Sequence, residues 1–267
     1  MFEMTASNTQ IASKPRMASP VASALVMTAR CMRLTSRKVD AMMTSLVLPI
    51  MLMLMFVYLF GGAINTGTTY VTYVVPGVLL LCAGFGASTT AVTVSEDMHN
   101  GIIDRFRSLD ISGMAVLAGH VVASVIRNAV STLLVFGVAF LIGFRPAATP
   151  LGWLAASGVL LLFIMAMSWF SAAIGLLAKS AEAASGFTFF VMFLPYASSA
   201  FVPIRTMPSW IQGFAQHQPV TPVTEALRAM LLGTSVGNDG WIALTWCGGI
   251  ILASMIVCSV LYRRRTT

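Results

Sequence analysis

Six long apolar runs, separated by short polar segments, make up most of this 267-residue chain. A helix needs about 20 predominantly apolar residues to cross the hydrocarbon core of a bilayer. Most of the runs are near that length or exceed it. The pattern predicts an all-α integral membrane protein with six transmembrane helices, at about residues 44–62, 71–95, 114–144, 151–178, 186–202 and 241–262.

The composition agrees with this interpretation. The chain is 57% hydrophobic and only 9% charged, with a mean hydropathy of +0.85, whereas soluble domains carry about 25% charged residues. The net charge is +7, but no basic cluster is interleaved with aromatic residues as in a nucleic-acid groove, so we expect no nucleic-acid partner. The four cysteines lack the spacing of a zinc site. We expect free thiols and no bound metal.

Two segments precede the first predicted span. Residues 1–18 have no apolar period and predict a disordered cytoplasmic tail. In residues 19–43, Arg30, Arg33 and Arg37 recur at i, i+3 and i+7, which predicts an amphipathic helix lying in the membrane interface. A solvated helix leading into the membrane is the alternative.

A polar segment at 96–110 interrupts the apolar sequence. Within it, Ile102, Ile103, Phe106 and Leu109 share one helical face, and Asn100-Gly101 is a plausible helix start. The helix would have about two or three turns, too few to span a bilayer. We interpret it as an amphipathic element at the membrane face that contacts another protein. An ordinary solvated loop is the alternative.

The connection at 203–240 predicts a second surface element, a re-entrant helical hairpin. Thr221 has the position of an N-cap before Pro222, and Gly233 ends the pattern about eleven residues later. Such a helix covers about half a bilayer at about 1.5 Å per residue. Glu225 and Arg228 lie at i, i+3 and are expected to pair, although a contact with substrate is the alternative.

One polar line occurs inside a predicted span. His120, Ser124, Arg127 and Ser131 fall at i, i+4, i+7 and i+11, on one face of the third helix. They form a possible wall of a translocation path, since a charge in lipid must face protein or water. The alternative is that Arg127 lies near the cytoplasmic interface and snorkels, because the third helix is longer than a bilayer requires on that side.

Basic residues determine the predicted orientation. With a cytoplasmic N-terminus, the inside segments, including a basic tail at 263–267, hold twelve Lys and Arg residues. The outside segments hold three: Arg145, Arg205 and Arg228. The positive-inside rule therefore places both termini and 96–110 in the cytoplasm, and 203–240 outside.

Neither the GxxxxGK[ST] motif nor the HExxH motif is present. We therefore assign no catalytic residue and no cofactor to the chain. A channel or secondary carrier that works without ATP, or an intramembrane enzyme, remains an alternative to a subunit driven by another protein.

Two segments carry a resemblance to a known family. The first cytoplasmic loop of the membrane subunit of type 2 ABC exporters is similar to EDMHNGIIDRFRSLDISG at 96–113, with its acid, glycine and short coupling helix. The outer re-entrant region of the daunorubicin-resistance branch resembles FVPIRTMPSWIQGFAQHQPVTPVTEALRAMLLG at 201–233. Together with the six-span plan, these motifs identify the chain as similar to that branch.

The resemblance implies a function and partners. A separate ATPase, in two copies, would bind ATP and Mg and drive export. A second permease copy or a paralogue would complete the path for a hydrophobic drug, polyketide or lipid across a bacterial plasma membrane. The ATPase-coupling residues would be Glu96, Asp97, Gly101, Ile102, Ile103, Phe106, Arg107 and Leu109. The outer re-entrant region would include Pro208, Trp210, His217, Pro219, Glu225 and Arg228.

The orientation is testable by thiol labelling in a variant whose native cysteines are replaced. Gly240→Cys should react with an impermeant thiol reagent added to intact cells, and Ser108→Cys should react only after the membrane is opened. The reverse labelling pattern would contradict the orientation that the basic residues predict.

Overall fold

A computed structural model describes residues 20–37, 39–64, 66–100 and 113–266. Every regular element in these ranges is helical, so the expected all-α class is confirmed. The helices are α1 (Pro20–Arg37), α2 (Val39–Met55), the π-helical turn η1 (Phe56–Phe60), α3 (Tyr70–His99), α5 (Gly113–Leu141), α6 (Pro150–Leu177), α7 (Ala181–Val191), the 3-10 turn η2 (Ile204–Thr206), α8 (Ser209–His217), α9 (Val220–Leu232) and α10 (Asp239–Thr266).

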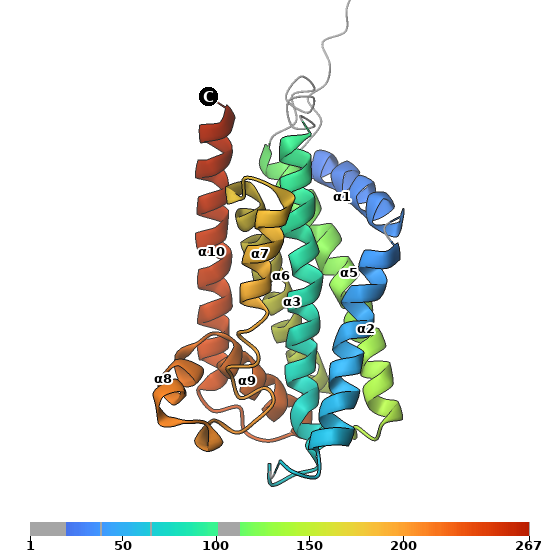
Figure 1. Ribbon diagram of the computed structural model, residues 1–267, viewed down its shortest axis with the longest axis vertical. Helices are drawn as coiled ribbons and strands as arrows, with labels where there is room; N and C mark the ends of the chain where they lie inside the picture. Colours follow the sequence, from blue (N-terminus) through green and yellow to red (C-terminus); the bar gives the residue numbers. More distant parts are fainter. Residues whose placement is uncertain (1–19, 38, 65, 101–112, 267) are drawn as a thin grey trace, which may run out of the picture.

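The long helices run side by side, with α1 across one end and α8 and α9 at the other (Figure 1). We call these the α1 end and the hairpin end. The ends of α3 and α6 and the start of α5 lie at the α1 end, as does the C-terminus of α10 (Figure 1).

Helices α3 and α6 form the centre of the bundle. In their most apolar windows, 72% of α3 and 78% of α6 are buried, against 17% of α10. Residues 78–83 of α3 are all buried, so this helix is enclosed on every side, as expected for a helix that is apolar all round. The outer helices leave many large apolar side chains exposed, which suits a lipid environment.

Among the described residues, four helices are long and apolar enough to cross a membrane: α3, α5, α6 and α10. The apolar part of α2 with η1, Leu46–Phe60, is shorter. The expected fifth span, 186–202, is helical only as far as Val191, and turns follow from 192. Pro195 explains the early end, because proline lacks an N–H and disfavours helical geometry in the preceding residue. The number of six spans therefore stays a prediction.

The 203–240 connection contains the two short helices that the sequence predicts, α8 and α9. Gly233 ends α9 with φ of 70° and donates its N–H to Ala229 O, as predicted. The predicted N-cap was wrong: Pro219 precedes α9, and Thr221 lies in its first turn. The Thr221 hydroxyl donates to Ala215 O instead, so a tertiary contact replaces the cap.

Some predictions fall outside the described residues. These are the tail at 1–18 and the residues Gly101, Ile102, Ile103, Phe106, Arg107 and Leu109. The described chain reaches this segment at Asn100, which ends α3 by donating its N–H to Glu96 O at 3.0 Å.

Candidate functional site

Arg30, Cys31, Asp97 and His120 form a cluster at the α1 end, which we call the Asp97 cluster. Arg30 is half-buried and the other three residues are buried. Asp97 lies in the last turn of α3. Arg30 of α1 donates from Nη1 to Oδ2 at 2.7 Å and from Nη2 to Oδ1 at 3.2 Å. This two-pronged hydrogen bond raises the pKa of the Arg30 guanidinium above its ordinary value. Asp97 therefore binds α1 as an ionised carboxylate.

His120 joins α5 to the same carboxylate. Its Nε2 lies 3.1 Å from Asp97 Oδ2. An ionised carboxylate can only accept, so Nε2 carries the proton and donates it. The other ring nitrogen, Nδ1, lies 3.5 Å from the Sγ of Cys31, and in the neutral ring it accepts from that thiol. One carboxylate thus connects α1, α3 and α5.

The close approach of α1 to α5 depends on Gly119. A Cβ at this position would lie 2.5 Å from the Cβ of Met27, so any larger residue would push α1 away. Beside this contact, Thr28 Oγ1 donates to Ala24 O at 2.8 Å and lies 3.5 Å from Gly119 O.

A second buried polar group, the Arg127 cluster, lies midway along α5 and consists of Gly86, Thr90, Ser124, Arg127, Asn128 and Ser168. Arg127 Nη2 donates to Gly86 O at 3.0 Å and to Thr90 Oγ1 at 3.1 Å, both on α3. Ser124 Oγ lies 2.9 Å from Ser168 Oγ of α6. The cluster therefore joins α5 to both central helices.

Within the described bundle, the Arg127 side chain points toward α3, and its depth in the membrane stays a prediction. Arg127 is 8% exposed and lies about 21 Å along α5 from Gly113, at about 1.5 Å per residue. Its guanidinium turns inward because the carbonyl of Gly86 accepts from it. Residue 86 must be small for this packing, since a Cβ there would lie 1.8 Å from the Oδ1 of Asn128.

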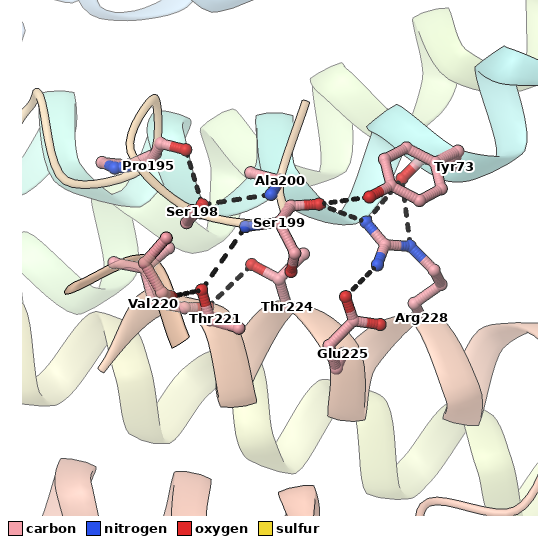
Figure 2. A network of polar contacts seen from close by, with 11 residues as sticks. Tyr73, Pro195, Ser198, Ser199, Ala200, Val220, Thr221, Thr224, Glu225 and Arg228 are labelled. Carbon is pink, nitrogen blue, oxygen red and sulfur yellow. Dashed lines mark hydrogen bonds and ion pairs between the residues drawn. The ribbon is translucent and has the colours of Figure 1, made fainter. Parts of the chain in front are cut away.

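At the hairpin end, Tyr73, Ser198, Ser199, Thr221, Glu225 and Arg228 form a third group, the hairpin network (Figure 2). Arg228 donates from Nη2 to Tyr73 O at 3.1 Å and to Ser199 O at 2.9 Å, and from Nη1 to Glu225 Oε1 at 2.6 Å. Its guanidinium carbon lies 3.8 Å from the centre of the Tyr73 ring, a cation–π contact. The predicted pairing of Glu225 with Arg228 is confirmed.

The hairpin network binds the non-helical segment 192–202. The Tyr73 hydroxyl donates to Ser199 O at 2.9 Å, and the Ser199 N–H donates to Thr221 Oγ1 at 3.4 Å. Gln218 donates from Nε2 to Leu194 O and Ala197 O at 2.9 and 2.7 Å. Side chains of α3 and α9, and of Gln218 between α8 and α9, therefore take part in hydrogen bonds that a helix would have made internally.

The remaining predicted residues of the outer region lie apart from the hairpin network. Trp210 is 80% exposed, and Pro208 and His217 are also exposed. The His217 Nδ1 donates to Gly213 O of its own helix at 2.8 Å. Pro219 is half-buried directly before α9.

Comparison with known proteins identifies the family. The sequence model of the ABC-2 type transporter family matches residues 23–232, which contain the Asp97 cluster, the Arg127 cluster and the hairpin network. The chain belongs to the ABC-2 type transporter family. This family consists of membrane subunits of ABC transporters, so the chain is a multi-pass membrane protein and a non-catalytic one.

Two related permeases are named for drug resistance. The daunorubicin resistance ABC transporter permease protein DrrB1 of Streptomyces coeruleorubidus is 32% identical over 220 residues, 82% of this chain and 78% of the relative. The probable doxorubicin resistance ABC transporter permease protein DrrC of Mycobacterium tuberculosis is 26% identical over 252 residues, 92% and 90% of the two chains. The predicted resemblance to the daunorubicin-resistance branch is confirmed.

The structure separates the predicted site residues of this ABC-2 family chain into different surroundings. Of the two acids expected at the ATPase contact, Asp97 binds within the chain, and Glu96 is half-buried. His120 belongs to the Asp97 cluster, whereas Ser124 and Arg127 belong to the Arg127 cluster. Ser131 is half-buried. A role of this polar line in a translocation path stays a prediction.

Sequence reasoning missed the partners of these residues. Arg30 was assigned to the basic stripe of an interfacial helix, and its side chain binds Asp97 of α3. Tyr73 and Ser199 were not singled out. The signal for Tyr73 was its spacing from Tyr70, because two tyrosines lie three residues apart at the start of an apolar run. Tyr70 binds the same segment as Tyr73, since its hydroxyl donates to Phe201 O at 2.9 Å.

Arg127 should contribute more to stability than an exposed arginine. Arg127→Ala should lower the free energy of unfolding by about 2 kcal/mol or more, because Gly86 O and Thr90 Oγ1 lose a charged donor in a buried position. Arg127→Lys should lower it by an intermediate amount, since a single ammonium replaces the planar guanidinium group. Arg205→Ala, at an exposed site, is the control. Thermal unfolding in detergent measures the three variants, and an Arg127→Ala protein as stable as the control would contradict the role.

Arg228 and Glu225 should contribute differently to the free energy of unfolding, although they pair with each other. Arg228→Ala removes the donor to Tyr73 O and Ser199 O, and we expect a loss of about 2 kcal/mol or more. Glu225→Ala removes a half-exposed partner and should cost about 1 kcal/mol or less. The same unfolding measurement compares them, and equal losses would mean that the ion pair, and not the carbonyl contacts, carries the stabilisation.

Proposed function

We propose that this chain is the permease subunit of an ABC exporter that moves a hydrophobic or amphipathic compound out across a bacterial plasma membrane. The observation that carries the proposal is the family match over 23–232, with relatives named for resistance to daunorubicin and doxorubicin. ATP and Mg would be bound by a separate ATPase in two copies. A second permease copy or a paralogue would complete the complex.

We also propose six spans, with both termini and residues 96–112 in the cytoplasm. The apolar stretch of α2 and the α7 region would provide the two spans besides the four long helices. The common position of α1, the end of α3, the start of α5 and the C-terminus at one end of the bundle supports this topology (Figure 1).

The Asp97 cluster supports a route for coupling ATP hydrolysis to the bundle. The proposed coupling helix, at 102–109, follows Asp97 by five residues in the chain. Asp97 holds Arg30 of α1 and His120 of α5. A displacement of the coupling helix would therefore act at once on α3, α1 and α5, because each is bound to the same carboxylate.

The coupling helix can be tested directly. By its spacing in the sequence, Phe106 is the largest residue on the apolar face. Truncating a buried aromatic anchor commonly costs about 2 kcal/mol or more, about thirtyfold in affinity. Phe106→Ala should therefore reduce co-purification of the partner ATPase and abolish ATP-driven export, while insertion into the membrane stays normal.

Arg107→Ala is the matched control, because Arg107 lies on the polar face of the same predicted helix and a rim charge contributes less. The ATPase encoded with the permease is captured from membranes holding each variant at equal amounts. Normal capture and normal export by Phe106→Ala would contradict the coupling helix.

A further inference from the structure

An apolar cavity of about 140 Å³ lies inside the bundle. Its walls come from α3, α6, α9 and α10 and from residues 191–195, where α7 ends. The walls include Leu81, Gly84, Phe163, Met167, Phe170 and Pro195. All of these lining residues belong to a single copy of the chain, and the cavity is partly open to its surroundings.

The lining determines what the cavity can hold. Its exposed wall is almost entirely apolar, and ordered water is held in a cavity only where two to four polar partners are available. An apolar cavity of about 150 Å³ in another protein stays dry and binds benzene. The volume here is close to that value, so the cavity accommodates a single benzene-sized ring, and substituents on the ring can extend through its open side.

The side chains on α6 favour an aromatic ring over a hydrocarbon chain. Phe163, Met167 and Phe170 recur at i, i+4 and i+7 and all line the cavity. Two phenyl rings provide stacked or edge-to-face contacts. The thioether of Met167 adds a sulfur–aromatic contact and adapts in shape.

The cavity also touches the segments that the hairpin network holds together. Pro195 and Val220 line it, and Figure 2 shows them at one end of the network, with Tyr73 and Arg228 at the other. Tyr73 and Arg228 line a second cavity of about 420 Å³, which is more polar. A molecule in the apolar cavity therefore contacts segment 192–202 and α9, and the polar cavity is bordered by the same two segments.

We propose that the apolar cavity binds one aromatic ring of the exported compound. This inference rests on the proposed function and deepens it, because it names an aromatic, amphipathic substrate class and a site within one permease copy.

Gly84→Leu is the decisive variant. Gly84 lines the cavity, and a Cβ built there meets no heavy atom within 4 Å, so the leucine side chain can enter the empty space. Gly137→Leu and Gly158→Leu are matched controls. Both glycines lie in helices, both are exposed, and a Cβ at either also meets nothing within 4 Å. The controls reproduce the change in helix propensity without filling the cavity.

The probe is 3-trifluoromethyl-3-phenyldiazirine, added to the full chain reconstituted in phospholipid bilayers. Light expels N₂ and leaves a carbene that inserts into a neighbouring C–H bond, and peptide mass spectrometry locates the adduct. Leu81 and Met167 report on the cavity. Leu252 and Ile256 of α10, which are 64% and 63% exposed, report on the outer surface.

We expect adducts at Leu81 and Met167 in the unchanged chain. Gly84→Leu should reduce them about tenfold, because the space for the ring is filled, while the adducts on Leu252 and Ile256 and those in the two controls stay within about twofold. Excess toluene should compete for the cavity, and decane should not. If Gly84→Leu does not fold, as judged by size-exclusion chromatography, Ile250→Phe narrows the cavity from α10 and should give the same loss.

Three results would overturn the proposal. The first is no adduct at Leu81 and Met167, and the second is as much adduct there in the filled variants as in the unchanged chain. The third is competition by decane as strong as by toluene, which would assign the cavity to an acyl chain. The labelling needs neither ATP nor the ATPase. Its failure therefore leaves the coupling test on Phe106 intact, and a failed coupling test leaves the labelling result intact.

Discussion

The fold depends on satisfying the backbone of one non-helical segment inside a bundle of apolar helices. Residues 192–202 interrupt the helix that α7 begins, and in a low-dielectric interior each unpaired carbonyl would cost several kcal/mol. Polar side chains remove this cost. Gln218 donates to Leu194 O and Ala197 O, and Ser199 O accepts from both Tyr73 and Arg228. The hairpin end is therefore organised around carbonyl groups, and its arginine is a structural donor.

The α1 end uses the opposite arrangement, in which one acceptor collects donors from two other helices. The carboxylate of Asp97 accepts from Arg30 and His120, and it is 8% exposed. Removing one partner of a buried charge leaves the other uncompensated, which is far more costly than the pair's net contribution. The amphipathic helix α1 is thus bound to the bundle by a charge pair in addition to its apolar face. The end of α3 is therefore linked to both α1 and α5 through this carboxylate.

Between these ends the bundle combines close packing with open space. At Gly86 and Gly119 there is no room for a Cβ, and these positions allow α3, α5 and α1 to approach one another. At Gly84, two residues from Gly86 on the same helix, a Cβ would meet nothing, and the apolar cavity lies there. Neighbouring glycines of α3 thus border a close contact with α5 on one side and open space on the other.

The sequence by itself determined the class of the protein and its local features. A chain that is 57% hydrophobic with 9% charge must pair its backbone internally in lipid, and long apolar runs do so as helices. The end of α9 at Gly233 and the Glu225–Arg228 pair were also predictable, because each depends on residues within one or two turns. Only the tertiary structure decided which buried polar residues meet. Arg30 and Asp97 are 67 residues apart, and Arg127 and Gly86 are 41 apart. Helical periodicity assigns a residue to a face but does not say which helix packs against that face, so it could not show that Arg127 turns inward or that a cavity lies beside Gly84.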